Sequence, residues 1–349
     1  MSLTNPRKHQ RILVVRPDRI GDVILATPLI RALHTTFPAA HIAAMVRPYT
    51  QELLLHNPHL NQVLVDDPRG AHNGRTGFLQ QVKLLRECRF DTALLLLPTQ
   101  RLAWMLFLAG IRTRVGVGTI LYEVLTFMKT VSRKKYVPLR HEADYCLDLG
   151  RAIGVDSQDL STELFLTDAE RQAARRTLHS RPGELLVGIH PGSGHSAPNW
   201  RIERYAELAS ILLRNQDVRI VVTGTPQEEE FTPFFDGIGS NRITNLIGQQ
   251  SLRELMATIS QLHLLVSAST GPMHIAAALN VNTVSMFCPL TACSPQLWGP
   301  KGNSAQVLVA PDNYCSHKCP GDPHVCDFEG GFELGMVHDA IMRSLGTFH

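Results

Sequence analysis

Long apolar runs are missing from this chain of 349 residues. The longest, 102–109, falls short of the roughly 18 apolar residues that a membrane-spanning helix needs, and it predicts a buried helix instead. No apolar segment follows the basic residues of the N-terminal stretch MSLTNPRKHQ, so we expect no secretory signal peptide. Seven cysteines are too few for a disulfide framework in a chain of this length, which favours a reduced, cytoplasmic protein.

Extremes of composition are absent as well. Apolar residues make up 44% of the chain and charged residues 19%, which excludes a disordered, collagen-like or coiled-coil protein. The length fits two globular domains of about 150 to 180 residues each.

Charge is unevenly distributed, although the net charge is only +3. Residues 1–150 contain 20 Lys and Arg against 11 Asp and Glu, whereas residues 151–349 contain 14 against 20. A basic half indicates an anionic partner, which would be an acidic substrate, a membrane surface or nucleic acid. The alternative is a chance distribution of solvated surface charge.

Strand-like and helix-like segments alternate through the first half, and the alternation restarts at 185–190 after a polar stretch. This pattern predicts an α/β fold with parallel sheets covered by helices on both faces. Two such domains would face each other across a cleft and bind ligands at the carboxyl ends of their strands. The predicted parts are an N-terminal domain (1–165), a linker region (166–183), a C-terminal domain (184–330) and a last helix returning to the N-terminal domain (331–349).

The first candidate site is the segment RPDRIGDVILATPLIRAL at 16–33. A strand ends here, the chain turns at Gly21, and Asp22 opens a helix. A carboxylate at this position would serve as a general base that takes a proton from an attacking hydroxyl. The alternative is that Asp22 only caps the helix, and Asp18 in the same turn competes for the same role.

Two loops of the second half suggest nucleotide binding. In HPGSGHSAPNW (190–200), the glycines allow a ligand close to the backbone, although a plain connecting loop fits equally well. In GTPQEEE (224–230), Glu228 would hold a ribose, or the acidic residues would only favour a helix N-terminus.

The segment SASTGPMHIAAALN at 267–280 is the most informative. The hydroxyl of Thr270, the N–H groups of Gly271 and Met273, and His274 would point to one spot at a helix N-terminus. Such a site would hold a pyrophosphate without a metal. The alternative is a structural histidine.

Two further stretches have a weaker pattern. Cys315, Cys319 and Cys326, with His317 and His324 between them, form half of a zinc-binding pattern, and a packed loop is the favoured interpretation. The stretch 101–135 combines apolar residues with clustered cations, which suits a membrane surface or an amphiphilic anionic acceptor. A buried helix followed by a solvated basic loop is the alternative.

Taken together, these segments resemble the ADP-heptose:lipopolysaccharide heptosyltransferases, the family-nine glycosyltransferases of the GT-B fold. The resemblance covers nearly the whole chain, in order, and includes the Cys-rich tail after residue 315. It rests on RPDRIGDVILATPLIRAL (16–33), HPGSG-x-S-A-x-N-W-x-x-E-R-Y-A-E-L (190–208), VVTGTPQEEE (221–230), NLIGQQSLRELMATIS (245–260) and STGPMHIAAAL (269–279).

The resemblance implies an N-terminal acceptor domain and a C-terminal domain that holds ADP-heptose. It implies inverting transfer of heptose to a sugar hydroxyl of the lipopolysaccharide inner core, or of a lipid-linked anionic glycan, with Asp22 as the base. No metal or other cofactor, and no nucleic acid, would be required, and the enzyme would be cytoplasmic or peripheral at the inner membrane. The expected donor-binding residues are Ser193, Gly194, Ser196, Gly224, Thr225, Glu228, Ser269, Thr270, Gly271, Met273 and His274, and the expected acceptor-binding residues are Arg19, Arg112 and Arg133.

Two positions depart from the family pattern. Many members carry Lys where this chain has Pro198, and Asp where it has Ser269. A proline supplies neither a charge nor an N–H to a departing diphosphate, so Arg201 or His195 would have to replace the lysine. The alternative functions are therefore a transferase for another nucleotide sugar or a protein acceptor, and a non-catalytic nucleotide-sugar binder.

Overall fold

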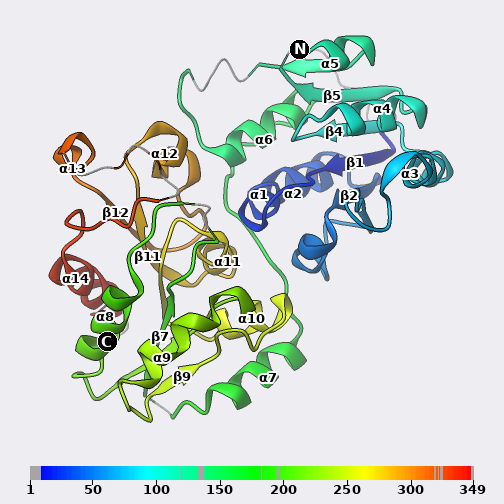
Figure 1. The fold of residues 1–349 in the computed structure, drawn as a ribbon. Coiled ribbons are helices and arrows are strands. Elements are labelled where there is room, and N and C mark those ends of the chain that lie inside the picture. The colour runs from blue at the N-terminus through cyan, green and yellow to red at the C-terminus, as the bar shows by residue number, and fades with distance from the viewer. Residues whose placement is uncertain are drawn as a thin grey trace. The chain divides into compact units, whose positions relative to one another are not determined.

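A computed structural model describes residues 9–118, 120–132, 137–181, 183–194, 197–317, 320, 322 and 325–346 (Figure 1). The chain divides into two compact units, residues 1–165 and 166–349. Each unit contains a six-stranded, fully parallel sheet, so the predicted α/β class is confirmed.

The sheet of the first unit places β1 at its centre. Its residues Ile12, Leu13, Val14 and Val15 are buried because helices cover both faces of the sheet. The chain builds β1, β2 and β3 in one direction and then returns to the other side of β1 with β4. The strand order is β3 (Gln62–Val65), β2 (His41–Val46), β1 (Arg11–Val15), β4 (Thr92–Leu95), β5 (Thr113–Val117) and β6 (Lys129–Val131).

Helices pack on both faces of this sheet. One core joins Leu13 and Val15 to buried residues of α3 and α4, and on the opposite face α2 packs against α6. The helical segments of this unit are α1 (Ile20–Ile24), α2 (Thr27–Thr36), the 3-10 turn η2 (Pro48–Leu54), α3 (Gly74–Cys88), α4 (Gln100–Leu108), α5 (Leu121–Leu125) and α6 (Glu142–Arg151).

The sequence predicts one helix over 22–36, whereas the structure divides this stretch into α1 and α2. Pro28 has no N–H to donate to the carbonyl of Ile24, four residues earlier. The hydroxyl of Thr27 donates to that carbonyl instead, at 2.7 Å. The break leaves α1 as a short helix directly after β1.

The apolar run at 102–109 lies largely within α4, where Leu102, Ala103, Met105 and Leu106 are buried. The prediction of a buried helix is therefore confirmed. Among the residues that the structure describes, no helix has both the length and the apolar character needed to cross a membrane.

The second unit repeats the same plan around β7. The chain builds β7, β8 and β9 in one direction and then returns to the other side of β7 with β10. The strand order is β12 (Ala305–Val309), β11 (Asn282–Phe287), β10 (Leu264–Ala268), β7 (Leu185–His190), β8 (Val218–Val222) and β9 (Ile243–Asn245). Its helical segments are α7 (Asp168–Leu178), α8 (Ile202–Leu212), η4 (Pro226–Phe231), α9 (Thr232–Asp236), α10 (Leu252–Ile259), α11 (Gly271–Ala278), η5 (Thr291–Cys293), α12 (Pro295–Trp298), α13 (Asp312–His317) and α14 (Leu334–Leu345).

The stretch 166–183, predicted as a linker region, belongs to the second unit. It forms α7, which packs against α10. The carboxylate of Glu170 accepts two hydrogen bonds from the guanidinium of Arg253, both at 2.7 Å. These bonds lower the pKa of Glu170 to about 2. A charged pair of this kind attaches the helix to its own unit.

The last helix, α14, also packs on the second unit. Val337, Ala340, Ile341 and Leu345 are buried in the core that includes β10 and β11. The sequence predicts that this helix returns to the N-terminal domain, whereas the contacts described for α14 lie within the second unit. The apolar side of α14 covers one face of the second unit's sheet. The sequence of a helix shows which side is apolar, but it does not show which sheet that side will cover.

Candidate active site

The sheet of the second unit brings three of the predicted donor segments together. β7 lies between β10 and β8, and all three run parallel. The loops that follow them therefore leave the same edge of the sheet, beside the point where the strand order reverses. These loops contain the motifs at 190–200, 224–230 and 267–280.

Glu228 lies in the first turn of η4 and is buried. One carboxylate oxygen accepts the backbone N–H of Thr225 at 2.8 Å, which closes a capping box. The other oxygen lies against the loop after β7, where a Cβ placed on Gly192 would be only 1.7 Å from it. Gly192 is therefore needed because the Glu228 side chain occupies the space of a Cβ.

His190, the last residue of β7, extends this polar group. Its ring nitrogen Nδ1 lies 3.0 Å from the hydroxyl of Thr223, and both residues are buried. Burial lowers the pKa of His190, and the charge of Glu228 only partly opposes this effect. The sequence analysis assigned no role to His190, although its place before a Gly-rich loop was the available signal.

The N-terminus of α11 supplies the third part of the group. Thr270 is the residue before the first helical turn, and its buried hydroxyl has no hydrogen-bond partner among the residues that the structure describes. The first N–H groups of any helix lack partners within the helix, so those of Gly271 and Met273 are suited to an anion. The Met273 side chain is fully buried, whereas His274 is buried one turn into the helix.

The remaining donor residues border the same loops. Ser193, Gly224, Ser269 and Gly271 are partly buried, whereas Gly194 and Thr225 are exposed. Gly194 has a φ of +51°, in the region that favours glycine. Ser196 lies outside the described residues.

In the first unit, Asp22 belongs to a cluster of one guanidinium and three carboxylates. Arg16 lies 2.6 Å from Asp22, 3.0 Å from Asp18 and 3.1 Å from Glu142. The side chains of Arg16 and Glu142 are almost fully buried, whereas 18% of the Asp22 side chain is exposed. Of these three side chains, only that of Asp22 is thus partly accessible to solvent.

Arg16 and Glu142 are not among the site residues predicted from the sequence. Glu142 is 126 residues away in the chain, at the start of α6. The one signal for Arg16 was an arginine directly after an apolar strand. No local pattern connects Glu142 with it, because only the packing of α6 brings the two together.

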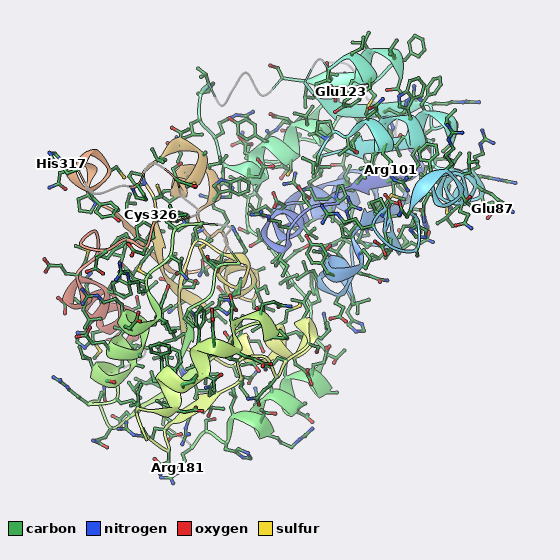
Figure 2. All side chains as sticks on the ribbon, in the orientation of Figure 1. Glu87, Arg101, Glu123, Arg181, His317 and Cys326 are labelled. Carbon is green, nitrogen blue, oxygen red and sulfur yellow. The ribbon has the colours of Figure 1, made fainter. Side chains whose placement is uncertain are left out.

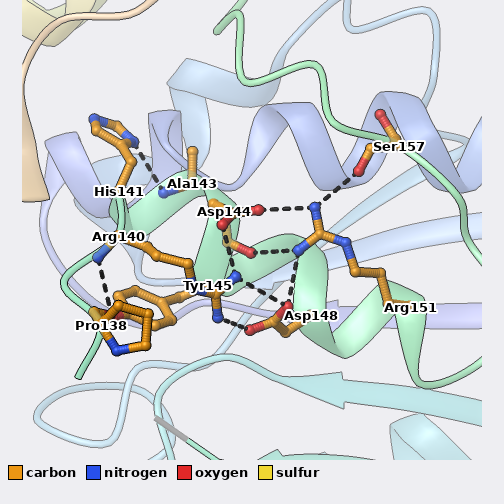
Figure 3. A network of polar contacts seen from close by, with 9 residues as sticks. All are labelled: Pro138, Arg140, His141, Ala143, Asp144, Tyr145, Asp148, Arg151 and Ser157. Carbon is orange, nitrogen blue, oxygen red and sulfur yellow. Dashed lines mark hydrogen bonds and ion pairs between the residues drawn. The ribbon is translucent and has the colours of Figure 1, made fainter. Parts of the chain in front are cut away.

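Further ion pairs hold α6 in place (Figure 3). Arg140 and Arg151 both bind Asp144, at 2.6 and 2.7 Å. Both also bind Asp148, and the guanidinium of Arg140 lies 4.6 Å from the centre of the Tyr145 ring. This network fixes the first turns of the helix, and hence the position from which Glu142 meets Arg16.

Burial raises the pKa of Asp18 to about 7, although the charge of Arg16 opposes the rise. The negative charges of Asp22 and Glu142 add to the effect of burial. Near neutral pH Asp18 is therefore only partly ionised, so it offers Arg16 less than a full negative charge.

This shift predicts a dependence of stability on pH. The folded protein keeps the proton of Asp18 up to a pH of about 7, whereas the unfolded chain releases it near its ordinary pKa of 3.8. The contribution of Asp18 to stability is therefore full below a pH of about 4 and is lost as the pH rises to about 7. Urea denaturation of wild type and Asp18→Asn across this range should show the wild type losing stability relative to the variant.

The exposed residue Asp156 of the same unit offers a matched control. Asp156→Asn should leave the pH profile of the wild type unchanged. Parallel profiles for wild type and Asp18→Asn would contradict the raised pKa of Asp18.

The predicted acceptor residues lie in different places. Arg19 is exposed and directly precedes α1, in the same turn as Asp22. Arg112 is exposed but precedes β5, so it lies at the opposite edge of the parallel sheet from Asp22. The structure therefore does not bring Arg112 to the carboxyl-end edge, and Arg133 lies outside the described residues.

The Cys-rich tail packs as part of the second unit. Cys326 is buried with its sulfur 3.4 Å from the hydroxyl of Tyr314, and Cys315 packs against the same core. Within the described part of the chain, no three His, Cys, Asp or Glu side chains are grouped to hold a metal ion. Cys319 and His324 lie outside the described residues.

Pro198 is buried in the loop after β7. Arg201, considered above as a substitute cation, forms an ion pair with Asp327 at 2.6 Å. The charge of Arg201 is thus balanced by the carboxylate of Asp327. The other candidate, His195, lies outside the described residues.

Two doubly wound units, each built on a six-stranded parallel sheet, are the architecture of a GT-B glycosyltransferase. Residues 79–322 match the sequence profile of Glycosyltransferase family 9 (heptosyltransferase). The chain belongs to this family, and it is accordingly a glycosyltransferase.

Individual relatives agree with this assignment. The chain is 27% identical over 312 residues to lipopolysaccharide heptosyltransferase 2 of Escherichia coli K12, with 85% of this chain and 87% of that protein covered. It is 26% identical over 353 residues to lipopolysaccharide heptosyltransferase 2 of Salmonella typhimurium LT2, with 97% of each covered. Its fold is similar to the crystal structure of the glycosyl transferase family 9 from Veillonella parvula DSM 2008, with a TM-score of 0.79 and 24% identity over 97% of this chain and 96% of that one.

Proposed function

We propose that this enzyme transfers a heptose from ADP-heptose to a sugar hydroxyl of the lipopolysaccharide inner core, with inversion and without a required metal. The observation that carries the proposal is the meeting of three loops at one edge of the second sheet. There Glu228 lies against Gly192, and the buried hydroxyl of Thr270 stands at the N-terminus of α11. The names of the relatives support the choice of heptose and of lipopolysaccharide.

Each part of the donor suits one part of this site. The carboxylate of Glu228 would accept hydrogen bonds from the ribose hydroxyls. The N–H groups of Gly271 and Met273 and the hydroxyl of Thr270 would bind the diphosphate, since a helix N-terminus favours negative charge. His274 would contact the diphosphate or the sugar from one turn further into the helix.

Asp22 would act as the general base. As the acceptor oxygen attacks the anomeric carbon, its proton would pass to the carboxylate of Asp22. The bond between that carbon and the diphosphate oxygen breaks, and ADP leaves with the electron pair. Arg16 binds the Oδ1 atom of Asp22, so Oδ2 is the oxygen that would take the proton.

The acceptor would be an anionic glycan on lipid. The basic balance of residues 1–150 favours such an acceptor, and Arg19 lies beside the proposed base. This acceptor would bring the enzyme to the inner membrane as a peripheral protein.

The direct test is an ADP-release assay with purified enzyme, ADP-heptose and heptose-free lipopolysaccharide core. ADP release that requires the acceptor, together with a product heavier by one heptose, is the expected result. Release at the same rate without the acceptor would contradict the proposed transfer.

A prediction for donor binding concerns Glu228. Glu228→Gln keeps an amide oxygen for the N–H of Thr225 but loses the charge offered to the ribose, so ADP should bind about tenfold more weakly in calorimetry. Gly192→Ala should have a similar effect, because the new Cβ would displace Glu228. The exposed neighbour Glu229 provides the control, and Glu229→Gln should bind ADP like the wild type. Unchanged affinity in Glu228→Gln would remove this residue from the donor site.

A second candidate function is favoured by Ser269, which stands partly buried beside Thr270 where many family members carry Asp. A different residue at a sugar-contacting position would suit another nucleotide sugar. The same assay with other nucleotide sugars decides between the two, because turnover of one of them in place of ADP-heptose would establish the second candidate.

A further inference from the structure

The surface of the first unit exposes a group of apolar side chains on and around α5. Ile120, Leu121, Val124, Leu125 and Phe127 are all exposed, with exposed fractions of 72% for Leu121 and 77% for Phe127. Soluble proteins seldom expose large apolar side chains side by side, and such patches mark surfaces that bind something. We call these five residues the α5 face.

The polarity of α5 is reversed relative to an ordinary surface helix. Its one charged residue, Glu123, which is labelled in Figure 2, is fully buried. The carboxylate of Glu123 accepts the N–H of Ile120 at 3.2 Å. Thr126 is buried too, and its hydroxyl donates to the carbonyl of Tyr122 at 2.7 Å. A helix that only covers a core turns its apolar residues inward. Here the polar groups point inward and the apolar groups point outward.

The C-terminal end of α5 packs against residues of α4 and β5. The ring of Phe127 lies 6.2 Å from that of Phe107 on α4, centre to centre. The guanidinium of Arg114 on β5 lies 5.3 Å from the Phe107 ring and donates to the carbonyl of Thr126 at 2.6 Å. The end of α5 and the side chain of Phe127 are therefore supported by an aromatic contact and a hydrogen bond.

The sequence around the α5 face is strongly basic. Between residues 92 and 141, Glu123 is the only Asp or Glu, and it is buried. Arg112 is exposed directly after Ile111, and Arg86 is exposed and binds the carbonyl of Leu108 at 2.7 Å. The same stretch of sequence contains Arg or Lys at positions 101, 112, 114, 129, 133, 134, 135 and 140. Of these, Arg101 and Arg140 are paired with carboxylates and Arg114 is buried.

We propose that the α5 face inserts into the interface of an anionic phospholipid membrane, with Arg86 and Arg112 attracting the lipid headgroups. Exposed apolar side chains combined with cations are the chemistry that binds such an interface. The inference deepens the proposed function, whose lipid-borne acceptor lies at a membrane, and it names the surface that makes the contact.

Co-sedimentation with vesicles tests this assignment. Wild type should bind vesicles of phosphatidylcholine containing about one-third phosphatidylglycerol, and bind pure phosphatidylcholine several-fold more weakly. The double variant Leu121→Ser/Leu125→Ser should lose at least about tenfold in partitioning, because two leucines no longer enter the apolar layer. Met336 on α14 is 43% exposed and belongs to the second unit, so Met336→Ser is the control and should bind like the wild type.

Several results would overturn the proposal. Equal binding by wild type and the double variant would remove the α5 face from the contact, as would a wild type that ignores anionic vesicles. Light scattering adds a further arm, since a wild-type dimer that becomes monomeric in the double variant without vesicle binding would make this face a self-association surface. Circular dichroism and melting curves matched to the wild type would show that the double variant folds.

The vesicle assay contains neither donor nor acceptor, so its outcome is independent of the transfer reaction. With a delipidated core acceptor, the double variant should release ADP as fast as the wild type. Vesicle binding without ADP release would contradict the proposed donor or acceptor, but it would still support the α5 face as the membrane contact. ADP release without vesicle binding would do the reverse.

Discussion

Asp22→Asn should reduce the rate of acceptor-dependent ADP release about 10³-fold, within the range of about 10²–10⁴ that general-base catalysis contributes. An amide cannot take the proton of the attacking hydroxyl, although it keeps the size and shape of the carboxylate. Binding of ADP-heptose should remain near the wild-type value, because the donor residues belong to the second unit. Steady-state kinetics and calorimetry on the same preparation would separate these two effects.

Asp18→Asn is the matched control for this experiment. Asp18 lies four residues before Asp22, and both bind the guanidinium of Arg16. The distance to Arg16 is 3.0 Å for Asp18 and 2.6 Å for Asp22. If Asp22 is the base, Asp18→Asn should retain most of the activity. A collapse in Asp18→Asn with an active Asp22→Asn would transfer the role to Asp18.

Arg16→Met should lower the free energy of unfolding by about 3–5 kcal/mol. Arg16 is the cation that Asp18, Asp22 and Glu142 share in a largely buried place. Methionine fills much of the same volume but leaves these carboxylates without a counter-charge. Chemical denaturation followed by circular dichroism would measure the loss.

Partial rescue would identify the cause of this loss. Arg16→Met/Glu142→Gln removes one of the uncompensated carboxylates, so it should be more stable than Arg16→Met alone. The exposed ion pair of Lys83 and Glu87, at 3.8 Å, supplies the control, and Lys83→Met should change stability little. A double variant no more stable than the single one would mean that lost packing, and not charge, destabilises Arg16→Met.

The central strands and their turns could be predicted from the sequence because each rests on a local pattern. The β1 segment is a run of buried branched residues, and Thr167 with Glu170 marks the start of α7 as a capping box that the structure contains. Three of the four edge strands, β6, β9 and β12, lack such a pattern, whereas the edge strand β3 follows from its apolar residues. β6 and β9 have only three residues each, and β12 alternates between partly buried and exposed residues, so pairing with a neighbour decides whether they form.

The sequence by itself determined the α/β class, the order of the motifs and the positions of Asp22, Glu228 and Thr270 at the ends of strands. Each of these depends on residues that are close in the chain. Only the tertiary structure decided that Glu142 joins Arg16 and Asp22, that α14 covers the second sheet, and that Arg112 lies at the edge away from Asp22. These outcomes depend on how helices pack and strands pair between segments that are far apart in the chain. Burial and charge bring such side chains together, and no local spacing in the sequence records this.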